Sequence, residues 1–471
     1  MKRRQFLSAS AAGAAGWLAA RQLSGGPLPP GESKLPPAAD QSVEQDQTAD
    51  PPQPQVTWSR KVPVRYEADV AVIGGGIAGV CAAAAAARSG ARVIVVERFA
   101  VTGGVLTSGG VANFCDESQV RRPLGEVFAE IVADLDAWQA IGHGRSSVFH
   151  YETMAIVLQE LLLRRGVKLL LHTRFVDARV RQGRISECIV CGASGPEALR
   201  AAQFIDCSGE SALARAAGFE TMSDWFDGRW RLPMSVMCFV RHVQGSPAGP
   251  FLPEGWFRPI TDKAGLPMTS VWPDGPGGNA LKIKIPMFDA TDTESLAAAE
   301  IAARRRVAEV VDYYQRVEKK PWLLDHCSPI IGIREGARIV GDYVLVVDDL
   351  RAGRAFDDGV ARGTYYLDGH KPDDDQRTYI LPKDQLAVPP YQIPLRSLIA
   401  RDGKNLMMAG RNFSAEQLAL SSARVSTSGA MMGQAAGIAA AMAAGRKCDP
   451  RDLEPADVRR VVQERGAELE V

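Results

Sequence analysis

The sequence has little of several features that mark other classes of protein. Its 471 residues include 55 lysines and arginines and 55 aspartates and glutamates, so the formal net charge is zero. It has no basic tract and no interleaving of basic with aromatic residues, the pattern typical of nucleic-acid binding. We therefore expect no nucleic-acid partner. The hydrophobic content of 46% is sufficient for a globular protein of about two domains.

Cysteine is also sparse, and its spacing indicates neither a metal site nor a disulfide framework. Of eight cysteines, Cys188 and Cys191 have CxxC spacing. They fall in residues 185–191, a predicted strand, and residues three apart on a strand point to opposite faces. No second CxxC pair and no nearby histidine completes a zinc site. We predict no metal site and expect these cysteines to be small buried apolar residues.

The N-terminus has no hydrophobic run long enough to be a convincing membrane span. Arg3 and Arg4 precede a run of small residues up to Ala20 that contains few large apolar side chains. This pattern resembles a twin-arginine export signal, assigned to residues 1–24; the alternative is an ordinary basic start on a disordered tail. Export would place the protein in the periplasm or another extracytoplasmic compartment. It would be tethered there if the signal stays uncleaved.

Residues 25–63 follow this segment and are rich in Pro, Gln, Asp and Ser. Such a composition cannot bury enough apolar surface to fold, so a disordered, Pro-rich linker is predicted. We expect the folded part to start near Val64.

The most informative stretch predicts one βαβ unit, with a strand at residues 69–73, a helix at 77–89 and a second strand at 93–96. Between the first strand and the helix lies the GxGxxG motif of Gly74, Gly76 and Gly79. The first glycine makes the tight turn, the second lets the backbone approach a pyrophosphate, and the third lets the helix pack closely. The N-terminus of such a helix binds phosphate.

Glu97 stands at the end of the second predicted strand, 18 residues after Gly79. An acidic residue at this place accepts the hydroxyls of an adenosine ribose. A GxGxxG motif alone is weak evidence, because a βαβ unit can exist without a nucleotide. Together with the flanking strands, the helix and Glu97, it predicts FAD or NAD rather than NADP.

The rest of the chain shows two kinds of sequence pattern. Helices are expected at residues 123–141 and 152–165, and strands at 167–171, 175–180, 185–191 and 202–207. Residues from about 220 to 400 have Pro-Gly loops between predicted strands at 234–240, 281–287, 343–347 and 391–394, with one long helix at 293–319. Near Asn405 the pattern is again that of the first 220 residues, with a predicted strand ending at Gly410 and a predicted helix at 426–444.

Several ordered motifs carry a family resemblance. They are residues 72–79, Glu97-Arg98 followed by Gly103-Gly104, and residues 204–209, 332–341, 391–394, 405–411 and 433–437. Over residues 66–447 the chain resembles FAD-dependent oxidoreductases of the glutathione-reductase/fumarate-reductase superfamily. More narrowly, it is similar to the single-chain, often exported type, some members of which are labelled xanthan-lyase-like.

The resemblance implies an α/β fold with a Rossmann-like, glutathione-reductase-type FAD-binding domain, in which helices cover a parallel sheet. This domain would comprise residues 64–220 and 400–447. A mixed, β-rich α+β substrate domain would comprise residues 221–399, and a C-terminal helical tail residues 448–471.

The resemblance also implies a set of FAD-binding residues. These are Gly74, Gly75, Gly76, Ile77, Ala78, Gly79, Glu97, Arg98, Gly103, Gly104, Thr107, Phe175, Ser208, Gly209, Gly410, Arg411, Gly433 and Gln434. Phe175 would meet the adenine, and Gly103, Gly104 and Thr107 would pass under the flavin. Gly410-Arg411 replaces the Gly-Asp of many relatives. The helix that contains Gly433 and Gln434 would direct its N-terminus at flavin N1 and the C2 carbonyl, where a reduced flavin is negatively charged.

Catalytic candidates come from the predicted substrate domain. Arg334 and Arg338, four residues apart, would clamp a carboxylate or sugar acid. The alternative is a surface or interdomain ion-pair cluster of these two arginines with Glu335 and Asp342. His370, in a polar loop, would accept a proton while hydride leaves for flavin N5; the alternative is a solvated surface histidine. Tyr391 and Arg424 are weaker candidates.

Two functions of different classes follow from these features. The first is an FAD-dependent oxidoreductase that transfers hydride from a small polar organic substrate to flavin N5. The sequence has no second dinucleotide fingerprint that would bind a nicotinamide. Outside the cytoplasm, the electrons would therefore pass to oxygen, a quinone or a cytochrome. The second is a non-redox lyase or carbohydrate-binding protein in which FAD is structural. A flavin that no donor reduces would favour this second reading.

Overall fold

The structure, a computed structural model, describes residues 56–142, 145–222, 231–245, 252, 255, 257–275 and 277–471. The chain divides into two compact units, Met1–Arg60 and Lys61–Val471. Only residues 56–60 of the first unit are described, and they form neither helix nor strand. The predicted export signal, and the predicted linker up to residue 55, lie outside the described residues. No helix in the described part combines the length and apolar character needed to cross a membrane.

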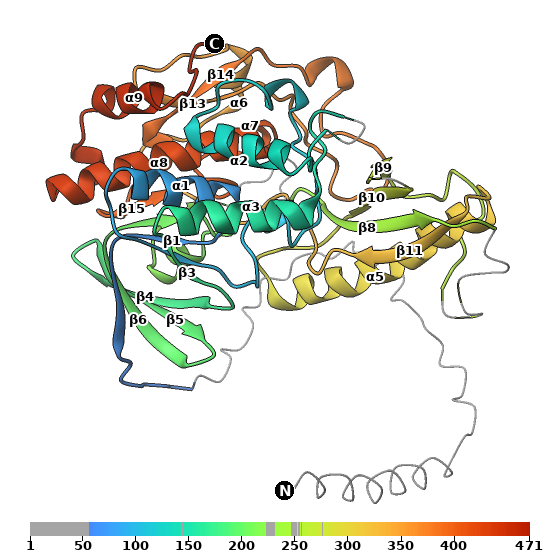
Figure 1. The fold of residues 1–471 in the computed structure, drawn as a ribbon, viewed down its shortest axis with the longest axis horizontal. Helices are drawn as coiled ribbons and strands as arrows, with labels where there is room; N and C mark the ends of the chain where they lie inside the picture. Colours follow the sequence, from blue (N-terminus) through green and yellow to red (C-terminus); the bar gives the residue numbers. More distant parts are fainter. Residues whose placement is uncertain are drawn as a thin grey trace, which may run out of the picture. The chain divides into compact units, whose positions relative to one another are not determined.

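The larger unit is built around a seven-stranded sheet (Figure 1). Its strands are β1 (Val64–Ile73), β2 (Val93–Val96), β3 (Lys168–Leu170), β4 (Arg174–Arg181), β5 (Arg184–Gly192), β6 (Gly195–Asp206) and β15 (Leu406–Met408). The order is β3-β2-β1-β6-β5-β4, and β15 pairs with the end of β6. Strands β3, β2, β1, β6 and β15 are parallel to one another, whereas β5 and β4 extend the sheet in antiparallel fashion. The predicted α/β fold with a Rossmann-like sheet is confirmed.

The parallel strands follow from uninterrupted apolar runs in the sequence. Residues 70–73 of β1 and all of β2 are buried, as expected for strands that are covered on both faces. Helix α1 (Ile77–Arg88) begins directly after Gly76, and its alanines from Ala82 to Ala86 are fully buried. The predicted βαβ unit is therefore present, with β2 at the predicted residues and α1 one residue shorter.

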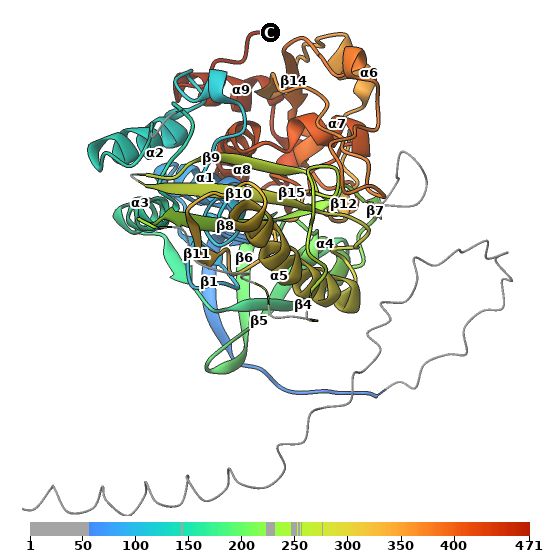
Figure 2. The same cartoon turned by 90° about the vertical axis from the view of Figure 1, so that its right-hand side faces the viewer.

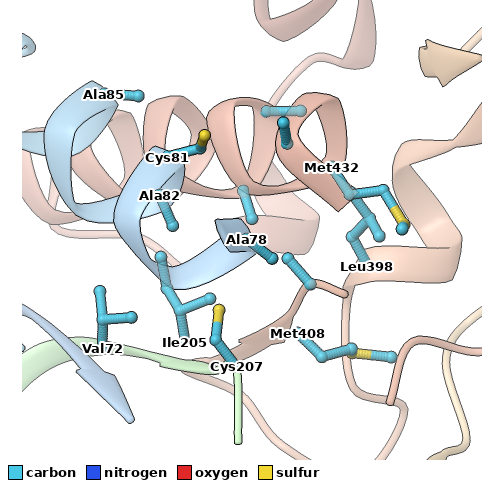
Figure 3. Close-up of a cluster of buried hydrophobic side chains, with 14 of the residues drawn as sticks. Val72, Ala78, Cys81, Ala82, Ala85, Ile205, Cys207, Leu398, Met408 and Met432 are labelled. Carbon is cyan, nitrogen blue, oxygen red and sulfur yellow. The ribbon is translucent and has the colours of Figure 1, made fainter. Parts of the chain in front are cut away.

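Helix α1 packs against α8 (Ser426–Arg446), which comes from the other end of the folded chain. A Cβ atom on Gly433 would lie 2.1 Å from the carbonyl oxygen of Ala78, and one on Gly437 would lie 2.1 Å from that of Ala82. The two helices therefore touch through their backbones, which requires glycine at both contacts. Because the contacts advance in the same direction along both helices, α1 and α8 are parallel. Figure 3 shows Ala78 and Ala82 in the space shared by α1, α8 and the sheet.

A smaller antiparallel sheet has the strand order β11-β8-β10-β9. Its strands are β8 (Met234–His242), β9 (Thr269–Pro273), β10 (Gly278–Ile285) and β11 (Trp322–Cys327). Alternate residues such as Val236, Leu281 and Ile283 form a core with the long helix α5 (Thr293–Arg316). Figure 2 shows α5 crossing one face of this sheet. The opposite face of β10 carries Lys282 and faces the cavity described below.

The remaining described elements are shorter. The helices are α2 (Glu126–Ala137), α3 (Tyr151–Arg164), α4 (Ala212–Ala216), α6 (Val347–Arg351), α7 (Gln417–Ala423) and α9 (Pro455–Glu464). Two strand pairs are β7 (Thr221–Met222) with β12 (Arg338–Ile339), and β13 (Gly359–Gly363) with β14 (Tyr391–Pro394). The predicted strand at residues 343–347 is wrong. Leu345 makes one bridge, to Ala415, and the chain then enters α6.

The predicted substrate domain, residues 221–399, contributes to two hydrophobic cores. Residues of β8, β10 and α5 form one of them. Residues from about 339 onward, including Leu345, Val360 and Ile393, belong to the main core together with α1 and α8. In the C-terminal tail, α9 also joins this core through Val458 and Val462. The second half of residues 221–399 thus packs as part of the nucleotide-binding side of the molecule.

Replacement of Gly437 by alanine tests the backbone contact between α1 and α8. Alanine has the higher helix propensity, but its Cβ has no room here, so we expect the free energy of unfolding to fall by about 1–3 kcal/mol. The matched control is Gly445→Ala near the end of the same helix, where a Cβ would meet no atom within 4 Å. That variant should be unchanged or up to about 1 kcal/mol more stable. Denaturant unfolding measures both, and equal stability of the two variants would contradict the contact.

Candidate functional site

A cavity of about 580 Å³ lies where the carboxyl ends of the parallel strands meet the antiparallel sheet. Residues directly after β1, β2, β6 and β15 line one end of it, namely Gly74, Glu97, Cys207 and Ala409. Side chains from β8 and β10 and from residues 330–334 line the other end. Open α/β sheets bind their ligands at this carboxyl edge.

The turn between β1 and α1 shapes the first end of the cavity. Gly74 has a φ of +101°, and a Cβ there would lie 2.4 Å from the carbonyl oxygen of Cys207. Gly76 lines the cavity, and a Cβ there would meet no atom within 4 Å. Gly76 is also the N-cap of α1, and no side chain caps the helix. The positive end of the helix dipole is therefore open to an anion.

Glu97 is fixed at this end by the backbone. Its Oε2 accepts a hydrogen bond of 2.7 Å from the N–H of Gly75, and its Oε1 accepts one of 2.9 Å from the N–H of Phe99. The side chain is 5% exposed. Burial raises the pKa of Glu97, and the two backbone N–H groups oppose this rise. The carboxylate is thus held in one orientation at the cavity wall.

Asp206, at the end of β6, organises the neighbouring loops although it is fully buried. Its Oδ1 accepts hydrogen bonds from the N–H and hydroxyl of Ser208, and from the side-chain amide of Asn412 after β15. Its Oδ2 accepts from the N–H groups of Leu213 and Ala214 at the start of α4. Burial raises the pKa of Asp206, with these hydrogen bonds opposing the rise. One carboxylate therefore joins two strand ends and a helix beside Ser208.

Glu210 contacts two arginines at the same wall. Its Oε1 lies 3.3 Å from Nη2 of Arg98 and 3.7 Å from Nη2 of Arg411. The Arg411 guanidinium lies against Gly209, where a Cβ would be 2.4 Å from Nη2. Burial lowers the pKa of Arg411 to about 10, so it stays charged at neutral pH. One carboxylate therefore offsets the charge of one of these two arginines.

The N-terminus of α8 opens into the same cavity as that of α1. Val425, Ser426 and Gly429 line it, and no side chain caps the helix. The positive ends of two parallel helices therefore converge on one space, as expected for a site that holds negative charge in two places.

Most of the predicted cofactor residues line this cavity: Gly74, Gly76, Ile77, Ala78, Glu97, Arg98, Gly103, Gly104, Phe175, Ser208, Gly209, Gly410 and Arg411. Five do not: Gly75, Gly79, Thr107, Gly433 and Gln434. Gly79 leaves room for the turn, since a Cβ there would lie 1.9 Å from the carbonyl oxygen of Gly74. Thr107 donates its hydroxyl to a backbone carbonyl of its own loop at 2.6 Å.

Gly433 and Gln434 have packing roles in the structure rather than the predicted flavin contact. Gly433 meets the backbone of α1, as described above. The side-chain Oε1 of Gln434 accepts a 3.2 Å hydrogen bond from the N–H of Val127 in α2. The cavity is reached by the first turn of α8, one to two turns earlier in the helix.

Arg334 lines the opposite end of the cavity and is 9% exposed. Its Nη1 donates a 2.6 Å hydrogen bond to the carbonyl oxygen of Pro233. Arg338 does not join it: its Nη2 lies 3.4 Å from Oε1 of Glu335, and both side chains are fully buried in the core. The predicted clamp of Arg334 with Arg338 is therefore wrong. Of the alternative ion-pair cluster, the pair of Arg338 with Glu335 is present, but it is buried and not at the surface. Arg338 begins β12 and is directed away from the cavity.

Asp368 is the centre of a polar cluster at this end. Its Oδ2 lies 3.0 Å from Nη2 of Arg424, and its Oδ1 lies 3.1 Å from Nε2 of His370. The hydroxyl of Tyr366 donates to Oδ1 at 3.2 Å. Burial would raise the pKa of Asp368, but His370 and Arg424 hold it below its ordinary range. Asp368 is therefore a carboxylate at neutral pH.

His370 is buried, with 3% of its surface exposed, so the alternative of a solvated histidine is wrong. Nδ1 lies 3.2 Å from the carbonyl oxygen of Thr378, and Nε2 faces Asp368. His370 lines the cavity, but both of its ring nitrogens face acceptors of the protein. Burial lowers the pKa of His370, and the Asp368 carboxylate opposes this. The ring of His370 is therefore held between Asp368 and the backbone of Thr378.

Sequence reasoning did not select four residues that line this end: Lys282, Tyr365, Tyr366 and Cys115. Lys282 had a detectable signal, because β10 alternates apolar residues with lysines, but an alternating strand usually directs its polar face to solvent. The tyrosine pair is in a loop, for which periodicity gives no information. Cys115 has its accessible surface at the cavity wall, and burial raises the pKa of its thiol.

A family model described as FAD dependent oxidoreductase matches residues 69–462. The chain belongs to this family. FAD is accordingly its cofactor, as the sequence predicted. A comparison with curated proteins found no match.

Solved structures of flavin enzymes show more distant similarity. A geranylgeranyl bacteriochlorophyll reductase-like protein from Thermoplasma acidophilum is 13% identical, with 85% of this chain and 84% of that chain covered and a TM-score of 0.46. The OxyS anhydrotetracycline hydroxylase from Streptomyces rimosus is 13% identical, with 84% and 65% covered and a TM-score of 0.42. These similarities carry no argument about the chemistry of this family member.

The cavity of this FAD-dependent oxidoreductase fits its cofactor on three observations. The open space beside Gly76 admits a group that approaches the backbone closely. Two helix N-termini without side-chain caps face the cavity. The fixed carboxylate of Glu97 stands at the end of β2, where such proteins bind a ribose.

Replacement of Glu97 by glutamine tests this end of the cavity. The substitution replaces one acceptor oxygen by an NH₂ donor. This donor either faces a backbone N–H, which is unfavourable, or takes the place of the oxygen that would accept the ribose hydroxyl. We expect the Kd for FAD to rise at least about tenfold, measured by flavin fluorescence during titration of the apoprotein. The control is Glu67→Gln, the same change at an exposed position of β1. An unchanged Kd in Glu97→Gln would contradict the assignment.

Proposed function

We propose that this protein oxidises a small polar organic substrate by removing hydride, with oxygen, a quinone or a cytochrome as the final electron acceptor. When bound, FAD supplies flavin N5 as the atom that receives the hydride. The proposal is supported by one observation above all: a single cavity joins the dinucleotide turn to a buried cluster of ionisable side chains. A purely structural cofactor would need the first feature without the second.

The nucleotide end of the cavity would hold the resident cofactor. We propose that the α1 N-terminus, with Gly74 and Gly76, binds the pyrophosphate and that Glu97 accepts the ribose hydroxyls. Val425 and Ser426, at the start of α8, would place N–H groups and a dipole end beside the flavin N1 side. Arg411, whose charge Glu210 balances, would line the wall between these two ends.

The Asp368 cluster would manage the proton that leaves the substrate with the hydride. A substrate hydroxyl that hydrogen-bonds to Tyr366 can give its proton to the phenol oxygen while the phenol passes its own to Asp368. Arg424 and His370 hold both carboxylate oxygens in place for this transfer. His370 takes part only through Asp368, because both of its ring nitrogens already face acceptors.

The proposed function is tested on the purified protein after export. Its absorbance spectrum should show flavin bands, and these should bleach on anaerobic mixing with an oxidisable substrate from a panel of alcohols, amines and hydroxy acids. Bands that return on admission of air would identify oxygen as an acceptor. A flavin that no member of the panel bleaches, although dithionite does, would count against substrate oxidation and favour the non-redox alternative.

Replacement of Tyr366 by phenylalanine removes the proposed proton path without changing the ring. The rate of flavin bleaching should fall by about 10²–10⁴-fold, with the FAD content unchanged. Tyr314→Phe is the matched control, because Tyr314 is in α5 and does not line the cavity. Stopped-flow absorbance measures both rates. Equal rates in the two variants would remove Tyr366 from the mechanism.

We further propose that the chain is exported in folded form by the twin-arginine route. The signal is recognised by a receptor through its arginine pair, so Arg3→Lys combined with Arg4→Lys should retain the precursor in the cytoplasm. Fractionation and immunoblotting measure this, with Arg21→Lys as a control that keeps the pair. Normal export of the double variant would exclude this route.

A further inference from the structure

Strand β10 of the antiparallel sheet presents Lys282 to the cavity. The other lysine of this strand, Lys284, is buried and donates a hydrogen bond of 3.0 Å to the carbonyl oxygen of Gln376. In β10, Leu281 and Ile283 pack against α5, and Lys282 between them faces the opposite side. Lys282 stands across from Met237 of β8 and Ser270 of β9, neither of which carries a charge. The sheet itself therefore does not balance the ammonium group.

The charged and titratable groups that face Lys282 come from other elements. They are Arg334, Arg424, Asp368 and the thiol of Cys115. Asp368 is already bonded to Arg424 and His370. Within the described part of the chain, Lys282 has no hydrogen-bond or ion-pair partner, although it is directed into a largely enclosed space. Burial, with Arg334 as the second cause, lowers the pKa of Lys282.

Arg334 is the second cation at this place. It uses one N–H to hold the carbonyl oxygen of Pro233, and no carboxylate of the described residues forms an ion pair with it. Burial lowers its pKa to about 10, and nearby Arg424 adds to this effect, so it remains charged at neutral pH. Arg334 is buried and Lys282 is half-buried, and two neighbouring cations without a carboxylate partner in such a place are costly unless an anion joins them.

We propose that Lys282 and Arg334 form a carboxylate-binding subsite, and that the substrate is therefore an organic acid. The proposal rests on the function proposed above, whose substrate class it names. A monoanionic carboxylate fits better than a dianionic phosphate, because the Asp368 carboxylate also faces this space. An organic acid that binds here would have its oxidisable carbon and hydroxyl toward Tyr366, which also lines this end.

The anionic parts of the cofactor do not account for these two cations. The pyrophosphate has its own site at the α1 N-terminus, and the flavin N1 side has the α8 N-terminus. Lys282 comes instead from the antiparallel sheet, at the end of the cavity opposite the dinucleotide turn. The unmatched charge is thus available to a molecule that enters and leaves.

The test is a titration of the oxidised holoenzyme with propionate, benzoate and phosphate, and with propionamide and benzamide, followed by flavin absorbance. We expect saturable spectral changes with the carboxylates but not with the amides or phosphate. Lys282→Met should raise the carboxylate Kd at least about tenfold, whereas Lys282→Arg should stay near the wild type. Lys263→Met, at an exposed turn, is the matched control and should change nothing.

The pH dependence gives a second readout. The ammonium attracts an anion only below the lysine pKa, so carboxylate binding should weaken as pH rises through the lowered pKa of Lys282. Because Arg334 stays charged to about pH 10, carboxylate binding to Lys282→Met should not weaken over the pH range in which Lys282 loses its proton. FAD content and the reduction potential should stay the same in that variant, since the lysine serves the substrate and not the flavin.

The outcomes separate this proposal from the function on which it rests. A protein without FAD, or with a flavin that no substrate reduces, overturns both. A flavin that substrates reduce, combined with carboxylates that bind equally to the wild type and Lys282→Met, overturns the subsite alone. A shift of the reduction potential in Lys282→Met without a change in carboxylate Kd assigns the lysine to the flavin and also overturns it. Tighter binding of phosphate than of carboxylates replaces organic acids with phosphorylated substrates.

Discussion

The close parallel packing of α1 and α8 is the constraint on which the site depends. Gly433 and Gly437 let the two helices touch along their backbones, and Gly429 lies beside Ile77 at the start of α1. Both helix N-termini therefore end at the same place, although α1 and α8 are separated by more than three hundred residues of chain. Parallel dipoles side by side repel each other, and an anion at their common positive end offsets that cost. The packing of α1 against α8 thus also favours the binding of a negatively charged cofactor at the N-termini of the two helices.

The βαβ unit could be predicted because its determinants are local. The turn needs Gly74 at a positive φ, Gly76 must leave open space, and Glu97 must follow β2 directly. Each requirement is met within about thirty residues and is visible in the sequence as spacing. Glycines in a helix are less specific. Gly433 is assigned to the flavin by the family resemblance, whereas its contact with Ala78 depends on tertiary packing that the sequence does not show.

The substrate end could not be predicted to the same degree, because its residues meet through the fold. Arg334 and Arg338 are close in sequence, yet one lines the cavity and the other is buried beside Glu335. Lys282 and Arg334 are 52 positions apart and come together because residues 332–334 run beside the start of β8, next to β10. The alternation in β10 marked a polar face correctly. It gave no sign that another part of the chain covers that face.

The two ends of the cavity use different kinds of electrostatics, and this difference matches what each would bind. At the nucleotide end, Glu210 pairs with Arg98 and Arg411, and helix dipoles and backbone N–H groups supply much of the attraction for an anion. Such groups are oriented by the fold and favour a ligand that stays in one geometry. At the other end, Lys282 and Arg334 are full charges without a carboxylate partner among the described residues. Full charges attract an anion over a longer range than a dipole does, which suits a ligand that is exchanged in every turnover.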